Sequence, residues 1–404
     1  MLRAQACVTA LGSFTFAAFL LGGCGQSTPR TANDAVIKAA TVAKETVPKV
    51  EEAPQLHIAA RSGHHQMHVF PAFGRTFVAA RGYIGEILNN GIVPRPELAK
   101  GLESAPGQPV GFYGDLKSEA YAVAISFGER SERYNVYKWS NNAWTLSNDH
   151  HGYATFFSSP SGATGTFVSH SDTPFLGMDQ KALAGAPTID GSRFASIASL
   201  SDSVLALEEP SYESDTKRAP RIAHWTKTGN RIYDLPLVGV SLANFRVVQM
   251  RAKGNRAMLL GTMGTSDNDV NAVQPYVATF DGSAWSRIDC PATMGEPNVG
   301  QLSPDGTLYL RTTKPKPGGN DVGSEHLWVR PVGGNWQSID LPKSGSGGKC
   351  WYQDLEADES AVWLTASCDN DEGPQQVLFT SHPAYAKGRT PEKIDDPQAP
   401  SHAP

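Results

Sequence analysis

Short runs of alternating apolar and polar residues, separated by turn residues, recur along most of the chain. The clearest is Leu302–Leu310, in which Asp305-Gly306 forms the turn and Leu308 and Leu310 alternate with Tyr309. Alternation with a period of two predicts strands with one buried face, and Asp-Gly is a typical hairpin turn. Further units of this shape turn near residues 62, 117, 161, 202, 254 and 359.

The seven predicted turns recur every 41 to 55 residues, a period typical of propeller blades. We therefore predict an all-β fold, a β-propeller of seven four-stranded blades. Six or eight blades are the alternatives, because strand signals are weak from Thr173 to Arg193. Between these hairpins lie others in which a turn is followed by Trp, as in Trp139–Trp144 and Phe280–Trp285. We expect these aromatic residues to pack between blades, the alternative being a platform for carbohydrate.

The composition agrees with a globular chain that turns often. Hydrophobic residues make up 40% of the sequence, and 39 Gly and 28 Pro are spread along it. The formal net charge is −5 at pH 7, so the chain as a whole offers no basic surface for a polyanion. We therefore expect no nucleic-acid partner.

The N-terminus has the pattern of an export signal. Arg3 precedes the apolar run Ala10–Gly23, which is too short to span a bilayer comfortably. The run ends in Leu21-Gly22-Gly23-Cys24, which resembles the bacterial lipobox. The resemblance implies that Cys24 becomes the acylated N-terminus of a membrane-anchored lipoprotein, because two or more acyl chains give stable anchoring. The alternative is an ordinary signal peptide followed by a chance cysteine.

The resemblance also bears on location. Gly25 stands where an Asp retains lipoproteins in the inner membrane of enteric bacteria, so the cell envelope, and within it the outer membrane, is the expected site. The predicted parts of the chain are a signal peptide at residues 1–23, an acylated cysteine with a flexible tether at 24–54, the propeller at 55–386 and a disordered tail at 387–404.

Three cysteines remain beyond Cys24 in an oxidising compartment. Cys350 and Cys368 lie in two strand-like runs on either side of a turn near Glu359, and a hairpin folded there places them opposite each other. Opposed strand positions are within reach of a disulfide, so we predict this bond. The alternative is a pair of buried thiols, and for Cys290 burial as a small apolar residue is the interpretation that we favour.

Polar segments are predicted to join the second and third strands of several blades. They include Glu208–Pro220, Gly264–Gln274, Lys314–Glu325 and Cys368–Gln375. An Asn-Asp pair recurs in three of them at the blade period, so the pairs should occupy equivalent places on one face. The candidate residues of this binding face are Asp267, Asn268, Asp269, Asn320, Asp321, Asn370 and Asp371. Their oxygens suit Ca²⁺, but the simpler interpretation is that they stabilise turns, and we expect no cofactor.

Other chemistry is weakly indicated. His64, His65 and His68 form a cluster that is a minor candidate for a copper or zinc site. The sequence has no HExxH or GxSxG motif and no phosphate-binding loop of Walker or Rossmann type. Paired carboxylates for glycoside hydrolysis, contributed by separate blades, are compatible with the sequence, because an amino-acid sequence does not give the distance between them.

These features together resemble the bacterial lipoproteins that carry a β-propeller. Ser303-Pro304-Asp305-Gly306 is similar to the turn of TolB-like blades, although the resemblance is architectural and not specific to one family. Together with the missing catalytic motifs, it leads us to predict a non-catalytic protein, held at a membrane by its lipid anchor, whose propeller face binds a protein or glycan. The alternatives are a carbohydrate-active or other hydrolytic propeller with carboxylates at the channel mouth, and a metal-dependent envelope protein.

Overall fold

The computed structural model describes residues 53–394, apart from short gaps, and two helices and 28 strands lie in this part. The gaps are at residues 64–65, 104, 106, 128–131, 152–154, 190–191, 210–218, 238–239, 241–244, 265–272, 315–323, 343–348, 360 and 371–372. The predicted signal peptide and almost all of the predicted tether therefore lie outside the described residues. Within the described part, neither helix is long and apolar enough to cross a membrane.

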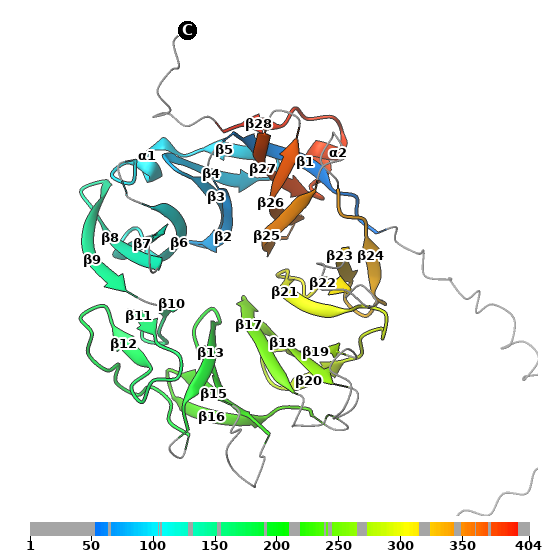
Figure 1. Cartoon of the computed structure of the whole chain (residues 1–404). Coiled ribbons are helices and arrows are strands. Elements are labelled where there is room, and N and C mark those ends of the chain that lie inside the picture. Colours follow the sequence, from blue (N-terminus) through cyan, green and yellow to red (C-terminus); the bar gives the residue numbers. More distant parts are fainter. Residues whose placement is uncertain are drawn as a thin grey trace, which may run out of the picture. The chain divides into compact units, whose positions relative to one another are not determined.

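Seven antiparallel sheets follow one another along the chain and are arranged around a common centre (Figure 1). Blade 1 contains β2 (His68–Ala72), β3 (Arg75–Ala80), β4 (Tyr83–Leu88) and β5 (Gly91–Pro94), and the short α1 (Pro96–Ala99) leads onward. Blade 2 contains β6 (Gln108–Asp115), β7 (Glu119–Phe127), β8 (Glu132–Ser140) and β9 (Ala143–His151). Blade 3 contains β10 (Thr155–Ser158), β11 (Thr164–Phe167) and β12 (Phe175–Gly177).

The remaining blades complete the ring. Blade 4 contains β13 (Phe194–Ser199), β14 (Val204–Glu208), β15 (Arg221–Thr226) and β16 (Gly229–Asp234). Blade 5 contains β17 (Arg246–Lys253), β18 (Arg256–Gly264), β19 (Val273–Phe280) and β20 (Trp285–Ile288). Blade 6 contains β21 (Glu296–Leu302), β22 (Leu308–Lys314), β23 (Ser324–Arg330) and β24 (Gln337–Ile339). Blade 7 contains β25 (Cys350–Ala357), β26 (Val362–Asn370), β27 (Gly373–Thr380), β1 (His57–Ser62) and β28 (Glu392–Lys393).

The prediction of a seven-bladed all-β propeller is confirmed, and its blades depart from four strands in two places. Blade 3 has three described strands, and only an isolated bridge between Leu176 and Ala182 marks the position of a fourth. This is the region whose strand signals are weak in the sequence. Blade 7 has five strands because β1, from the beginning of the domain, pairs with β27 and in turn with β28.

Six of the predicted turns join the first and second strands of blades 2 to 7, where the hairpin pattern placed them. The turn predicted near residue 62 is wrong, because β1 ends there and the chain passes to another blade. The corresponding turn of blade 1 is Phe73-Gly74, where both residues have positive φ, 51° and 72°. A Phe rarely adopts this conformation, so the turn has no recognisable sequence signal.

Aromatic and aliphatic side chains fill the interfaces between blades. Trp139 lies directly opposite Trp144 in the ladder, and Trp144 is buried and stacks on Phe112 of the same blade at 5.3 Å between ring centroids. Phe112 in turn contacts Phe77 of blade 1. Packing of these tryptophan hairpins between blades is therefore what the structure shows, and it removes Trp144 from any carbohydrate surface.

The C-terminal segment adds a strand to the edge of blade 7, although the sequence analysis predicts disorder from residue 387. β28 adds in parallel to β1, and the backbone N–H of Ile394 donates to the carbonyl of Arg61 at 2.9 Å. Ile394 is buried with Tyr385, which follows the start of α2 (Pro383–Ala386), and with Trp363 of β26. The predicted boundary at residue 387 is therefore wrong by several residues, since a buried isoleucine and a backbone ladder hold Lys387–Ile394 in place.

Candidate functional site

The first strands of the seven blades line the centre of the propeller, each next to the first strand of the neighbouring blade. All of them run in the same direction, so each face of the ring collects one class of connection. We call loop face the side where second strands pass to third strands and where the chain reaches each new blade. We call turn face the side that carries the hairpins between first and second strands.

Two cavities occupy the channel. The loop-face cavity, about 370 Å³, is lined by Thr155, Ser196, Gln249 and other residues near the beginnings of β10, β13 and β17. The turn-face cavity, about 350 Å³, is lined by the later parts of the first strands, including Tyr113 and Glu356. The two cavities share Thr155, Ile197, Met250 and Arg251. They are therefore adjoining spaces of one channel, at the lower end of the size range of ligand pockets.

A buried carboxylate links three blades at the turn-face end of the channel. Glu356 on β25 is 2% exposed, and its Oε1 lies 2.7 Å from Nζ of Lys253 on β17. Nε2 of Gln301 on β21 donates to its other oxygen at 2.8 Å. Burial raises the pKa of Glu356, while the ammonium of Lys253 acts in the opposite direction. Both carboxylate oxygens are thus already occupied by protein donors.

A contact between a histidine and a carboxylate joins the first and last blades. His68 on β2 lies 2.8 Å from Asp354 on β25, between Nδ1 and Oδ2. Of the predicted histidine cluster, His64 and His65 lie outside the described residues, so this pair is what the structure describes of it. In the described part of the chain, no group of three or more His, Cys, Asp and Glu side chains is placed to hold a metal ion.

A third pair lies at the loop-face cavity, and the sequence analysis did not identify it. His170 belongs to the connection between β11 and β12, and Glu209 follows β14. Their Nδ1 and Oε1 atoms are 2.9 Å apart, and both side chains line the cavity. The two residues are 39 positions apart in the sequence and carry no motif, so only the neighbouring placement of blades 3 and 4 brings them together.

The predicted binding-face residues come after the ends of second strands, and most of them lie outside the described residues. The connections between β18 and β19 and between β22 and β23 contain two of the Asn-Asp pairs, and both connections lie outside the described residues. The third pair is placed differently from the expectation, because β26 continues to Asn370 and pairs with Gly373. Asn370 is therefore the last residue of a strand, and Asp371 lies outside the described residues.

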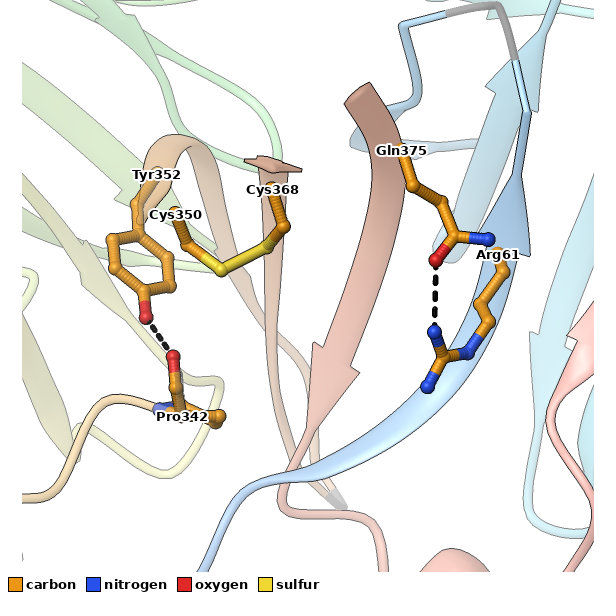
Figure 2. Close-up of a disulfide and its surroundings, with 6 residues drawn as sticks. All are labelled: Arg61, Pro342, Cys350, Tyr352, Cys368 and Gln375. Atoms are coloured by element: carbon orange, nitrogen blue, oxygen red, sulfur yellow. Dashed lines mark hydrogen bonds between the residues drawn. A yellow bond between two sulfur atoms is a disulfide. The ribbon is translucent and has the colours of Figure 1, made fainter. Parts of the chain in front are cut away.

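The predicted disulfide between Cys350 and Cys368 is confirmed (Figure 2). The two residues are directly opposite in the ladder of β25 and β26, with their Cα atoms 4.0 Å apart. A bulge between Tyr352 and Leu355 shifts the register by one residue toward the turn. The bond covalently joins the beginning of β25 to the end of β26, at the loop face.

The surroundings of the disulfide hold the loop-face end of blade 7 together. The hydroxyl of Tyr352 donates to the carbonyl of Pro342, in the connection from blade 6 (Figure 2). On the other edge of the blade, Nη1 of Arg61 on β1 donates to Oε1 of Gln375 on β27 at 2.8 Å (Figure 2). Next to the disulfide, Trp351 is 48% exposed, which is unusual for an indole on a first strand.

Cys290 is the one free cysteine among the described residues. It packs against the apolar cluster of blades 5 and 6, together with Ile288 and Met294. Burial raises the pKa of its thiol to about 12. The structure thus agrees with an inert, partly buried residue.

Comparisons with known proteins found distant likenesses among solved structures. No protein-family model matches the chain, and no curated protein matches its sequence. Among solved structures, the β-propeller domain of the Trilobed protease from Pyrococcus furiosus is similar, with 10% identity, a TM-score of 0.43, and 81% of this chain and 95% of that chain covered. The Drosophila Semaphorin 1b extracellular domains 1–2 match at 11% identity and a TM-score of 0.37, with 82% and 88% covered.

An ancestral GH74 enzyme matches at 11% identity and a TM-score of 0.38, over 81% of this chain and 48% of that one, so the chain spans about half of its length. Likenesses this distant include both enzymes and binding domains and carry no argument about activity. The ring of seven successive antiparallel sheets, closed by β1 on β27, identifies the chain as a seven-bladed β-propeller.

Proposed function

We propose that this protein is a membrane-anchored lipoprotein of the cell envelope whose loop face binds a protein or glycan partner without catalysing a reaction. The membrane part of the proposal depends on the lipobox-like sequence that ends at Cys24. The binding part depends on the loop face of blades 4, 5, 6 and 7.

The observation that carries the proposal is the exposed Trp351 at the loop face, the same side on which the second strands of blades 4, 5 and 6 end. Trp351 is held near the end of a strand that the disulfide fixes, so its ring loses little conformational freedom on binding. The segments 209–220, 265–272 and 315–323 join second to third strands in three successive blades before it. In blade 1 the same connection is the two-residue turn Arg81-Gly82. Large aromatic anchors surrounded by polar groups are typical of recognition surfaces.

The channel carboxylates support binding over hydrolysis. Glu356 and Glu209 are the acids that line the two channel cavities in the described part of the chain, and Glu356 is paired with Lys253 at 2.7 Å. A general acid or nucleophile has to reach substrate with at least one free oxygen. Glu356 has both oxygens engaged by Lys253 and Gln301, so this buried acid serves the packing of blades.

The anchor is tested by labelling cells with radioactive palmitate. The chain should incorporate the label and sediment with membranes, and Cys24→Ser should abolish labelling and release the protein. Cys290→Ser is the control that leaves acylation unchanged. An unlabelled chain, or label that persists in Cys24→Ser, contradicts the lipoprotein assignment.

The binding face is tested by mild crosslinking of the full chain in its native envelope, followed by capture and identification of attached protein or glycan. Replacement of Asn268-Asp269 and Asn320-Asp321 by Gly-Ser, and Trp351→Ala, should each reduce recovery of the same partner at least about tenfold, as loss of a central contact does. Lys117→Gly, in an exposed turn at the turn face, is the matched control. A partner that survives all three changes contradicts this choice of face, and failure to capture any partner contradicts the proposed role.

A further inference from the structure

The channel contains an arginine whose guanidinium has no partner among the described residues. Arg251 lies on β17 and lines both channel cavities, where they meet. In the described part of the chain its guanidinium has no hydrogen bond and no ion pair, and its side chain is exposed to the channel. The neighbouring cation on the same strand, Lys253, is in contrast fixed on Glu356 at 2.7 Å.

The charge of Arg251 acts on ionisable groups of two other blades. It lowers the pKa of Tyr113 on β6, which burial raises, and it also lowers the pKa of Glu356 on β25. Glu356 is paired with Lys253 at 2.7 Å, and Glu209 lies against His170 at 2.9 Å, so neither carboxylate makes a direct contact with the guanidinium of Arg251. A guanidinium left unpaired in a partly enclosed space attracts an anion.

Hydroxyl groups of two other blades line the same space. Thr155 begins β10 and Ser196 lies on β13, and both line the loop-face cavity with Arg251. Within the described residues neither hydroxyl makes a hydrogen bond, so both can donate to a bound oxygen. Val110 and Met250 add apolar surface in the turn-face cavity. The channel therefore provides one guanidinium group, two neutral hydroxyl donors and an apolar surface.

We propose that the central channel binds a small organic anion, either a carboxylate or a phosphate ester, through the guanidinium of Arg251, with the hydroxyls of Thr155 and Ser196 as further donors. Carboxylates and phosphates both present two oxygens at the spacing of a guanidinium fork, which makes the contact bidentate. Cavities of about 370 and 350 Å³ limit the ligand to a small molecule. This site lies in the channel and includes residues of the loop-face cavity, and the proposal does not depend on the proposed binding of a partner at the loop face.

The test is isothermal titration calorimetry on the full chain in non-ionic detergent. The probes are succinate, citrate, glycerol 3-phosphate and inorganic phosphate, with glycerol as the neutral probe and NaCl holding the ionic strength constant. We expect binding of at least one anion and none of glycerol. Binding confined to succinate and citrate identifies a carboxylate site, and binding confined to the phosphates identifies a phosphate site.

Variants assign the binding to Arg251. Arg251→Gln should weaken the affinity about tenfold or more, and Arg251→Lys should give an intermediate value because it keeps the charge and loses the fork. Arg231→Gln, on the outer strand β16, removes an equal charge far from the channel and should leave the affinity unchanged. An unchanged melting temperature shows that Arg251→Gln remains folded. No binding of any anion, or equal binding to Arg251→Gln, overturns the proposal.

Discussion

Removal of Lys253 should show how strongly the buried carboxylate of Glu356 depends on its ion-pair partner. Lys253→Met keeps much of the aliphatic chain and deletes the ammonium that lies 2.7 Å from Glu356. Glu356 is 2% exposed, so its charge would be left in the interior with the amide of Gln301 as the remaining donor. Breaking a buried ion pair by removing one partner costs about 3–5 kcal/mol, because the other charge remains desolvated.

The expected loss is large enough to measure by heating. A domain of roughly 340 residues has an entropy of unfolding on the order of 0.7 kcal/mol per kelvin, so Lys253→Met should melt about 4–7 °C lower at pH 7. The double variant Lys253→Met/Glu356→Gln, which removes both charges, should recover most of this loss. Lys138→Met is the matched control, since Lys138 and Glu119 are also 2.7 Å apart but nearly half exposed. Its effect should stay within about 1 kcal/mol.

The pH dependence gives an independent check. Without Lys253, the pKa of Glu356 in the folded protein rises further above its unfolded value, because burial raises it and the ammonium no longer opposes burial. The folded state of Lys253→Met then binds the proton more tightly than the unfolded state. The variant should therefore be close to wild-type stability below the ordinary glutamate pKa of about 4.3, and its stability deficit should grow as pH rises through the folded pKa. Calorimetric melting from pH 4 to pH 8 measures this. A deficit that is under 1 kcal/mol at pH 7, or equal at all pH values, refutes a buried, ionised Glu356.

Three further predictions concern the rest of the domain. Replacing Cys350 and Cys368 by Ala opens a loop with a sequence separation of 18, so melting should fall by about 4 °C, from roughly 3 kcal/mol of lost chain entropy, and reductant should then have no further effect. Deleting residues 388–404 should lower the melting temperature by about 2–4 °C, because Ile394 leaves the core, whereas deleting 395–404 should leave it unchanged. Equal effects of the two deletions would contradict the packing of residues 388–394 against blade 7. Cys290, with a pKa of about 12, should react with iodoacetamide at pH 8 more than about 100-fold slower in the folded than in the denatured protein.

The sequence by itself determined the repeat, because each blade needs its own alternating strands and its own turn. Asp305-Gly306 illustrates this, since an Asp-Gly turn between short apolar runs is readable without any neighbour. The cross-strand disulfide was also predictable, because hairpin pairing places Cys350 opposite Cys368 whatever the rest of the fold does. The blade that lacks a described fourth strand was the one with weak signals.

The tertiary structure alone decided how the ring closes and what lies in the channel. The paired positions of β1 and β27 are between 314 residues apart, at Ser62 and Gln376, and 323 residues apart, at His57 and Thr380, so this pairing leaves no local pattern in the sequence. Lys253 meets Glu356, and His170 meets Glu209, because first strands of different blades converge on one axis. Hydrophobic periodicity reports which face of a strand is buried. It does not report which distant side chain lies next to a buried carboxylate such as Glu356. That contact depends on the number, order and closure of the blades.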